Sequence, residues 1–447
     1  MKIAILGAGE SGVGAALLAQ AKGLEVFVSD MGQIKEQYKA KLATAAIPFE
    51  EGKHTFERIL DADQIVKSPG IPDKAPIIQE AIKKGVAVIS EIEFAGRYTD
   101  AKFIGITGTN GKTTTTLLTY HLLKSAGLNV GLAGNIGESL AEKVIENKYE
   151  YYVLELSSFQ LDNMYQFKAH VAVLLNITPD HLDRYEYSMD KYAASKLRVA
   201  QNMTGADFFV FNADDENIAK AFKSEAFAGT AVPFSLKGAE GVRVYFEDKH
   251  IKVTEKFYEG TVDTSKSGLI GKHNQYNTMA AVAVAKLLGV EDKQIEQALE
   301  TFENAEHRLQ QVGVAKEVTY INDSKATNVE AVWYALDGIK QPIIWIAGGV
   351  DKGNDYSTLV DLAREKVKVL ICLGKDNEKL KQAFGRVIPI IAETTSMDYA
   401  VRLSRSLATP GDVVLLSPAC ASFDLFNNYE HRGQRFKEAV EKIVLKK

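Results

Sequence analysis

The sequence predicts an α/β protein of three domains, each built on a largely parallel sheet. Short apolar segments of strand length alternate with segments of helical spacing along all 447 residues. That alternation is typical of parallel sheets covered by helices. No fixed-period repeat and no low-complexity segment interrupts it. The length suits three domains, and we expect them at residues 1–98, 99–305 and 306–447.

The first domain begins with a strand, a glycine-rich turn and a helix. The turn reads Gly7-x-Gly9-x-x-Gly12, and Asp30 follows the next strand, where a ribose-binding acid belongs in dinucleotide-binding folds. The pattern predicts a Rossmann-like domain with a phosphate or pyrophosphate at the helix; a purely structural turn is the alternative. The loop Lys67–Pro72 is either a rigid connection or part of a ligand site. The expected elements are strands at Lys2–Leu6, Glu25–Ser29, Gln64–Lys67 and Val86–Ser90, and a helix at Val13–Lys22.

The central domain opens on a second glycine-rich turn. The apolar run Ala101–Ile106 leads into Gly105-Ile-Thr-Gly-Thr-Asn-Gly-Lys-Thr-Thr-Thr-Thr116, and a segment of helical spacing follows. Backbone N–H groups of such a turn face phosphates, while Lys112 adds a positive charge and Thr113 a hydroxyl for Mg²⁺. The strict pattern has a glycine at position 106, which Gly105 and Gly108 flank here. We therefore predict a P-loop-type ATPase domain with a variant loop, rather than a glycine-rich turn without a ligand.

Polar side chains follow later strands of this domain. Glu155 closes an apolar strand, where a carboxylate needs a cation or hydrogen-bond partner, and Mg²⁺ is a natural one. His181 follows the next strand, directly after Asp180. These residues either belong to a site, or Asp180 is the N-cap of a helix. Since parallel strands end at one edge of a sheet, we expect Lys112, Glu155 and His181 on one rim. The strands are expected at Tyr151–Leu156, His170–Ile177 and Phe208–Asn212.

The rest of the central domain departs from this pattern. Short alternating segments predict a small antiparallel insertion. In the helix expected at Asn274–Leu288, Asn274 and Asn277 either cap the helix or contact a base edge. Lys196 also lies on a helix, and its spacing alone indicates an exposed lysine. The strands of the insertion are expected at Val242–Phe246, Lys249–Val253 and Glu255–Glu259.

The last domain again alternates strands and helices, which predicts a Rossmann-like α/β fold. Polar loops follow three of its strands, at Asn322–Asn328, Gly348–Gly353 and Ser417–Phe423, and they too are expected on one rim. Cys420 has no base adjacent in sequence, so we interpret it as a small buried residue and not a nucleophile. The expected elements are strands at Val318–Ile321, Ile343–Ala347, Val369–Leu373, Ile388–Ile391 and Val413–Leu416, and a helix at Lys437–Val444.

Composition limits the classes of partner. The net charge is −5, which argues against electrostatic binding to nucleic acid or to an anionic membrane. No stretch approaches the roughly 20 apolar residues of a membrane helix, and the first apolar run is too short for a signal peptide. Cys372 and Cys420 lack metal-ligand spacing, which fits a reduced, cytoplasmic compartment. We expect a monomer.

Taken together, the motifs resemble the Mur ligase family of ATP-dependent amide ligases. They occur in order through all three expected domains, and Asn322–Asn328 resembles the members of the family that add D-glutamate. The motifs are the Gly105–Thr114 loop, Leu-Glu-Leu-Ser-Ser-Phe-Gln at residues 154–160, Asp180-His181, Gly-Lys-His-Asn at residues 271–274, His307-Arg308 and Ser-Pro-Ala-Cys-Ala-Ser at residues 417–422.

The resemblance implies ATP, two Mg²⁺ ions and a role for each candidate residue. Catalysis would fall to Lys112, Glu155, His181 and Lys196, the last as a carbamylated lysine; Thr113, Glu155, His181 and Lys196 would hold the metal. ATP would contact Gly108, Thr109, Asn110, Gly111, Lys112, Thr113, Thr114, Asn274, Asn277, Arg308 and Asp323. The UDP substrate would contact Glu10, Ser11, Asp30, Ser68, Pro69, Gly70, Asn135 and His181, although Met31-Gly32 depart from the family's uracil side. D-glutamate would contact Lys325, Thr327, Ser422 and Phe423.

The implied reaction forms an amide in the cytoplasmic stage of peptidoglycan synthesis. ATP phosphorylates the carboxylate of UDP-N-acetylmuramoyl-L-alanine, and the amine of D-glutamate attacks the acyl phosphate. Another Mur-type ligase with a different amino acid is one alternative. An NAD-linked oxidoreductase, based on the first glycine-rich turn and Asp30, is a second, but it gives Lys112, Glu155 and His181 no role. A non-catalytic nucleotide switch is a third.

Overall fold

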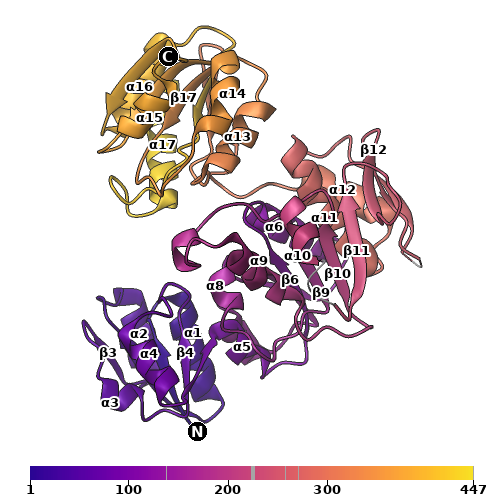
Figure 1. The fold of residues 1–447 in the computed structure, drawn as a ribbon, viewed down its shortest axis with the longest axis vertical. Coiled ribbons are helices and arrows are strands. Elements are labelled where there is room, and N and C mark those ends of the chain that lie inside the picture. The colour runs from indigo at the N-terminus through magenta and orange to yellow at the C-terminus, as the bar shows by residue number, and fades with distance from the viewer. Residues whose placement is uncertain (137, 223–226, 257, 270, 446–447) are drawn as a thin grey trace. The chain divides into compact units, whose positions relative to one another are not determined.

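The computed structural model describes residues 1–136, 138–222, 227–256, 258–269 and 271–445 (Figure 1). These residues form three sheets in two compact units. One unit comprises residues 1–268 and 275–302, the other residues 269–274 and 303–447. The predicted α/β class is confirmed, whereas the domain limits 1–98, 99–305 and 306–447 stay predictions.

The first sheet has five parallel strands in the order β3-β2-β1-β4-β5. Alternate residues of β1 face two cores: α1, α2 and α5 cover one face, and α3 and α4 the other. Helix α1 begins at Glu10, inside the segment predicted as a turn, because the Val13 N–H already bonds to the Gly9 carbonyl. The elements are β1 (Lys2–Leu6), α1 (Glu10–Ala21), β2 (Glu25–Asp30), α2 (Glu36–Thr44), β3 (Phe49–Glu51), α3 (Phe56–Ile59), β4 (Gln64–Lys67), α4 (Pro76–Lys83), β5 (Ala87–Ser90) and α5 (Glu91–Gly96).

The second sheet has nine strands in the order β14-β13-β12-β11-β10-β9-β6-β8-β7. Neighbours from β12 to β7 are parallel, so the carboxyl ends of β6, β8 and β9 share one edge. The elements are β6 (Lys102–Thr107), α6 (Lys112–Ser125), β7 (Val130–Gly134), α7 (Leu140–Glu146), β8 (Tyr151–Glu155), α8 (Ser158–Leu161), β9 (Val171–Leu174), η1 (Leu182–Arg184), α9 (Met189–Leu197), η2 (Arg198–Ala200), β10 (Phe208–Asn212), α10 (Glu216–Phe222), β11 (Thr230–Ser235), β12 (Val244–Glu247), β13 (His250–Val253), β14 (Gly260–Asp263), α11 (Lys272–Leu287) and α12 (Asp292–Thr301).

The predicted antiparallel insertion is present, but its third strand is misplaced. Strands β12, β13 and β14 pair antiparallel, and β12 continues the main sheet by pairing with β11. The predicted strand Glu255–Glu259 is wrong, since the Tyr258 N–H closes a turn on the Glu255 carbonyl; residue 257 lies outside the described residues. The strand is β14 instead, where Val262 pairs with Ile251 and both are buried.

Helices α1, α5 and α7 join the first two sheets through one continuous apolar core. The contact is close, because a Cβ on Gly14 of α1 would lie 2.1 Å from the Ser139 hydroxyl that caps α7. That hydroxyl and the Ala141 N–H each donate to Glu91 Oε1 at 2.6 Å. Burial raises the pKa of Glu91 to about 7.

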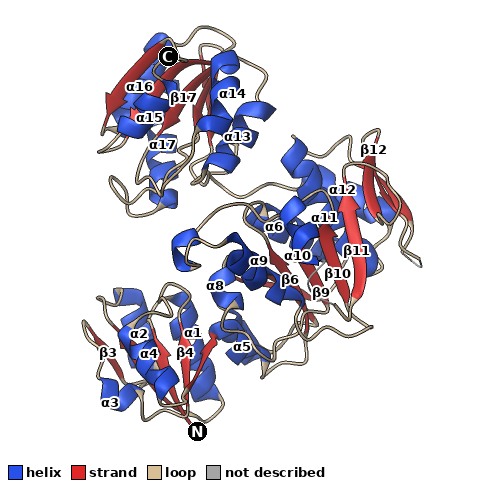
Figure 2. Ribbon diagram, in the orientation of Figure 1, coloured by secondary structure: helices blue, strands red, loops and turns tan. Residues whose placement is uncertain are grey.

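The third sheet lies in the other unit and has the strand order β15-β16-β20-β17-β18-β19. Only the pair β15–β16 is antiparallel among its described strands. Helices α13, α14 and α15 pack on one face of this sheet and α16 and α17 on the other. Figure 2 shows the strands of the sheet among these helices. Helix α17 begins at Tyr429, eight residues before the predicted start Lys437. The elements are β15 (Gln310–Ala315), β16 (Val318–Asn322), α13 (Val329–Gly338), β17 (Ile343–Ala347), η3 (Ser357–Leu359), α14 (Val360–Lys366), β18 (Val367–Leu373), α15 (Glu378–Phe384), β19 (Ile390–Thr394), α16 (Met397–Leu407), β20 (Val413–Leu416) and α17 (Tyr429–Val444).

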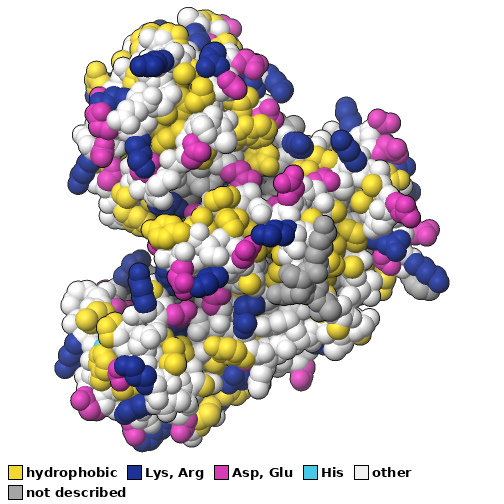
Figure 3. Space-filling model, in the orientation of Figure 1, with side chains coloured by type: hydrophobic (Ala, Val, Ile, Leu, Met, Phe, Trp, Pro, Cys, Tyr) yellow, Lys and Arg dark blue, Asp and Glu magenta, His cyan; other side chains and the backbone are white. Residues whose placement is uncertain are grey.

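The surface carries both signs of charge. On the face drawn in Figure 3, Lys and Arg side chains are interspersed with Asp and Glu side chains. This mixture accords with the net charge of −5. Within the described part of the chain, no helix combines the length and apolar character needed to cross a bilayer.

Candidate active site

The glycine-rich loop of the second sheet connects β6 to α6, as predicted. Gly108 and Gly111 have φ values of +156° and +83°, which L side chains rarely adopt. A Cβ on Gly111 would lie 2.3 Å from Asn277 Oδ1, and the Thr115 hydroxyl donates to the same oxygen at 3.2 Å. The loop backbone therefore requires glycine, and Asn277 of α11 lies directly against it.

Two lysines converge on one carbonyl of this loop. Lys112 Nζ donates to the Gly108 carbonyl at 2.9 Å and to the Thr109 carbonyl at 2.7 Å. Lys196 Nζ, from α9, donates to the Gly108 carbonyl at 2.8 Å. Both amines thus lie at the start of α6, whose N-terminus favours anions.

Lys196 is the largest departure from the spacing argument, which indicated an exposed side chain. It is 1% exposed and lies over the ring of Tyr192, with Nζ 4.7 Å from the ring centroid. Burial, and then the nearby charge of Lys112, lower its pKa well below the ordinary value. A neutral amine is favoured at this position, and a neutral amine is a nucleophile.

Glu155 ends β8 at the same edge of the sheet. It is 2% exposed, and Asn135 Nδ2 donates to its Oε1 at 2.9 Å. Its Oε2 is buried and has no hydrogen-bond partner. A buried carboxylate oxygen without a partner is costly, so this atom is suited to a cation.

The segment after β9 lies against the phosphate loop. Asn110 and Asn176 exchange two hydrogen bonds, and Thr109 and Thr178 exchange two more. His181 follows in the left-handed region, with φ of +51°, and its side chain is 44% exposed. Its ring makes an edge contact with Phe159, at 5.2 Å between centroids. The structure therefore brings the His181 segment to the predicted rim with its imidazole accessible.

The first glycine-rich turn is fixed by side chains of neighbouring strands. Asp30 accepts the Ala8 N–H at 2.6 Å and the Gly32 N–H at 2.7 Å, one on each carboxylate oxygen. The acid on which the NAD hypothesis relied therefore holds the turn. A Cβ on Gly7 would lie 2.6 Å from the Ser68 hydroxyl, so the loop with Ser68, Pro69 and Gly70 lies beside this turn. Glu10 and Ser11 form the first turn of α1.

The third sheet collects polar loops at the carboxyl ends of β16, β17 and β20. Asp323 is buried and accepts from the Ser417 hydroxyl at 2.9 Å and from the Leu309 N–H at 3.2 Å. Burial raises the pKa of Asp323 to about 7, although the nearby Arg308 opposes this rise. Arg308 Nε is itself buried without a hydrogen-bond partner.

The residues predicted for the amino acid lie along the same loops. Lys325 Nζ lies 5.3 Å from the ring centroid of Tyr429, which opens α17. Ser422 is buried, Thr327 is partly buried and Phe423 is 72% exposed.

Asn274 belongs to the unit that contains the third sheet, whereas Asn277 belongs to the unit that contains the first two sheets. Cys420 is buried with a free thiol, as predicted.

Arg432 is a buried residue beneath these loops that the sequence argument did not identify. It is 1% exposed and donates to the Ser324 hydroxyl and to the carbonyls of Ser324, Cys420 and Gly348, at 2.8 to 3.4 Å. One guanidinium thus connects the loops after β16, β17 and β20. The sequence offered one indication of its burial. Arg432 lies at helical spacing from Phe436, Val440 and Ile443, which are buried on the same face of α17.

Three family models match the chain. The Mur ligase MurD-like N-terminal domain matches residues 1–90, the Mur ligase middle domain residues 106–285, and the Mur ligase glutamate ligase domain residues 307–420.

Proteins named UDP-N-acetylmuramoylalanine–D-glutamate ligase are similar over their full length. The chain is 51% identical to that of Christiangramia forsetii over 99% of both chains, and 52% identical to that of Bacteroides fragilis over 99% of this chain and 100% of the relative. It is 53% identical to that of Cytophaga hutchinsonii over 99% of both chains.

Solved structures share the fold at lower identity. The UDP-N-acetylmuramate-alanine ligase MurC of Thermotoga maritima superposes with a TM-score of 0.62 at 20% identity, over 99% of both chains. A pseudomurein peptide ligase type C of Methanothermus fervidus gives 0.63 at 22% identity, again over 99% of both chains.

Proposed function

Since the chain belongs to the Mur ligase family, we propose that it joins D-glutamate to UDP-N-acetylmuramoyl-L-alanine at the expense of ATP. The products are the extended UDP-muramyl peptide, ADP and phosphate, formed in the cytoplasmic stage of peptidoglycan synthesis. Support for the amino acid comes from the relatives of that name, whose sequences are about half identical to this chain throughout.

The observation that carries the proposal is the convergence of Lys112 and Lys196 on the Gly108 carbonyl. Transfer of a phosphoryl group to a carboxylate brings two anions together, so positive charge must gather where they meet. Lys112 supplies that charge beside the N-terminus of α6. The acyl phosphate formed from the L-alanine carboxylate is then attacked by the amine of D-glutamate, and phosphate leaves.

The residues at this edge fit Mg²⁺, which binds oxygen ligands and keeps several waters and phosphate oxygens. Glu155 Oε2 is buried without a partner, and Thr113 places a hydroxyl in the first turn of α6. Among the described residues, no group of three or more His, Cys, Asp and Glu side chains could hold a metal. This absence agrees with a metal site in which phosphate oxygens of the substrate supply part of the ligands. Bound Mg²⁺ would supply charge neutralisation of the transferring phosphoryl group.

Lys196 is the candidate for a carbamate. Burial favours the neutral form of its amine, which can attack CO₂ and lose a proton to give a carbamate anion in place of an amine. That anion would help hold a second Mg²⁺, with Glu155 and His181 as the other protein ligands. Burial of Lys196 supports this modification, since an exposed lysine would stay protonated and unreactive at neutral pH.

The remaining assignments follow the family resemblance. Glu10, Ser11, Asp30, the Ser68–Gly70 loop and Asn135 serve the UDP substrate, while Asn274, Asn277, Arg308 and Asp323 serve ATP. Lys325, Thr327, Ser422 and Phe423 serve D-glutamate. We further propose that the three domains are 1–98, 99–305 and 306–447, and that the protein acts as a monomer.

The test is ADP and phosphate release from UDP-N-acetylmuramoyl-L-alanine and ATP with a panel of amino acids. We expect release with D-glutamate and little with L-glutamate, L-lysine or meso-diaminopimelate. Lys112→Ala should lose about three powers of ten in turnover, because removal of one preorganised charge-stabilising group costs about that much. Lys124→Ala, an exposed lysine on the same helix, is the matched control. Release with another amino acid, or near-normal turnover of Lys112→Ala, would overturn the proposal.

A further inference from the structure

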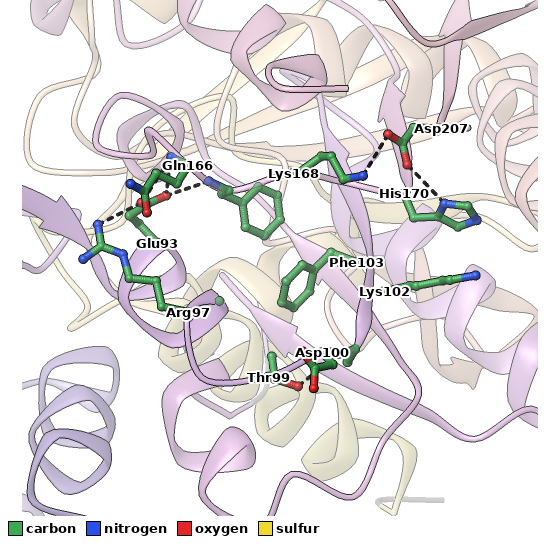
Figure 4. Close-up of a pocket in the computed structure, with 13 residues that line it drawn as sticks. Glu93, Arg97, Thr99, Asp100, Lys102, Phe103, Gln166, Lys168, His170 and Asp207 are labelled. Carbon is green, nitrogen blue, oxygen red and sulfur yellow. Dashed lines mark hydrogen bonds and ion pairs between the residues drawn. The ribbon is translucent and has the colours of Figure 1, made fainter. Parts of the chain in front are cut away.

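A cavity of about 440 Å³ lies at the edge of the second sheet opposite the phosphate loop. Lys102, His170 and Asp207 stand at the amino ends of β6, β9 and β10, and Arg97 and Asp100 lie between α5 and β6 (Figure 4). The six residues of β6 separate it from the loop by about 20 Å. None of the residues assigned above to ATP, UDP substrate or D-glutamate lines it.

The floor of the cavity is aromatic. Phe103 and Phe167 are both buried, with ring centroids 4.9 Å apart and planes inclined by 31°. A Cβ on Gly96 would lie 3.6 to 3.8 Å from atoms of these two rings, in ordinary van der Waals contact. A methyl group on Gly96 would therefore lie directly against both rings, at the border of the cavity.

The two buried carboxylates of the wall are already saturated. Glu93 is 1% exposed and accepts the N–H groups of Tyr165, Gln166 and Phe167 and one nitrogen of Arg97. Asp207 is 2% exposed and accepts from Thr204, Lys168 and His170. Although burial alone would raise its pKa, these partners lower it, which keeps Asp207 charged.

What remains accessible is mostly cationic or hydrogen-bond donating. The side chains of Lys168, Arg97 and His170 are 44%, 30% and 20% exposed. Lys102 is exposed, with Nζ 6.0 Å from the ring centroid of Tyr151, and it forms no ion pair with a carboxylate of the residues that the structure describes. Figure 4 shows Lys168, His170 and Lys102 on one side of the phenyl ring of Phe103 and Arg97 on the other. Asp100 is the one accessible carboxylate among the described lining residues.

We propose that this cavity is a second binding site, for a planar organic anion the size of a single aromatic ring. The ring would lie on Phe103 and Phe167, and the carboxylate or phosphate would contact Lys102, Lys168 and His170. The volume is within the range of small-molecule sites, and an apolar floor with a few convergent polar groups is their usual composition. The site does not depend on the proposed function.

Benzoate is the probe, and saturation-transfer NMR on the full chain measures its dissociation constant beside those of benzyl alcohol and benzylamine. We expect benzoate to bind several-fold more tightly than either, since only benzoate offers an anion to the lysines. Lys102→Gln with Lys168→Gln should weaken benzoate about tenfold, as two charge-assisted contacts are lost. Gly96→Ala should weaken all three probes, because the methyl group narrows the aromatic floor.

Two variants localise the binding. Lys148→Gln is the matched control, because Lys148 lies over a tyrosine ring as Lys102 does but does not line the cavity. Lys112→Ala removes the main cation of the phosphate loop. Benzoate affinity should be unchanged in both. Loss of affinity in Lys112→Ala, unchanged affinity in the double variant, or preference for benzylamine would each overturn the proposal. Gly96→Ala leaves every charge in place, so it keeps the test valid if the double variant fails to fold.

Discussion

Lys196 of α9 and Arg432 of α17 are both 1% exposed, yet burial lowers their pKa values to very different extents. Among the described residues, Lys196 has a single hydrogen-bond acceptor, the Gly108 carbonyl, and its pKa falls well below the ordinary value. Arg432 has four acceptors, and its pKa falls only to about 10, so it stays charged at neutral pH.

The difference lies in the chemistry of the two side chains. An ammonium on a flexible stem gives up its proton when desolvated, whereas a planar guanidinium retains its charge and distributes it over several acceptors. The lysine lies where we propose a reactive amine, and the arginine lies where it connects three loops. The first two of the following predictions each test one side of that contrast, and the third tests the burial of a carboxyl group in the same unit as Arg432.

The largest expected effect is on turnover in Lys196→Met. Methionine fills a similar volume without an amine, so we expect a loss of at least about a thousandfold in kcat, the order expected when a group that stabilises the transition state is removed. The free energy of unfolding should be unchanged or slightly higher, because replacing a buried ionisable group by an apolar one is often stabilising. Steady-state kinetics and urea unfolding measure the two effects. In Lys196→Ala, partial rescue by acetate or formate would support the carbamate; full activity without rescue would contradict it.

Arg432→Met should instead reduce stability. Removing the guanidinium leaves buried carbonyls of Ser324, Cys420 and Gly348 without donors, which costs about 3–5 kcal/mol. Both tryptophans of the chain, Trp333 and Trp345, lie in this unit. Tryptophan fluorescence during urea unfolding therefore follows the unit by itself. Arg432→Lys should lose less, and a Met variant within 1 kcal/mol of wild type would show that the connection is dispensable.

The smallest effect is a pH dependence from Asp323. Burial raises its pKa to about 7 from 3.8, so the folded protein binds this proton more tightly than the unfolded chain. Its contribution to the free energy of unfolding is complete below about pH 4 and is lost as pH rises through 7. Asp323→Asn cannot titrate. The difference between wild type and Asp323→Asn, again followed by tryptophan fluorescence, should therefore fall between pH 4 and pH 7; a constant difference would contradict the assignment.

The fold could largely be predicted because most strands of the three sheets are short apolar runs with clear ends. The strands that the sequence did not indicate are β3, β7, β11, β14 and β15, and all of them except β11 lie at an edge of their sheet. Edge strands bury less surface and therefore need fewer apolar residues. The error at Glu255–Glu259 has a related cause, since alternation in a short polar segment fits a turn as well as a strand.

The site was predictable where local chemistry is distinctive and not where it depends on tertiary packing. Lys112 and Glu155 follow apolar strands, so their place on one rim could be deduced. The position of Lys196 depends on how α9 packs against the phosphate loop, and its helical spacing in the sequence did not indicate that packing. Arg432 occupies a core position of α17, and a charged residue in that register is a signal that a closer examination of periodicity would have found.

The continuous core beneath α1, α5 and α7 bears on how the protein can be divided experimentally. A recombinant fragment beginning near residue 99 would uncover the apolar side of α7, including Leu140, Ala141 and Val144, and would leave Ser139 without Glu91. Such a fragment should aggregate or require compensating polar substitutions. Residues 303–445 bury a core of their own on both faces of the third sheet. Inhibitor screening against a truncated protein would therefore do better with a fragment of these residues than with one that begins near residue 99.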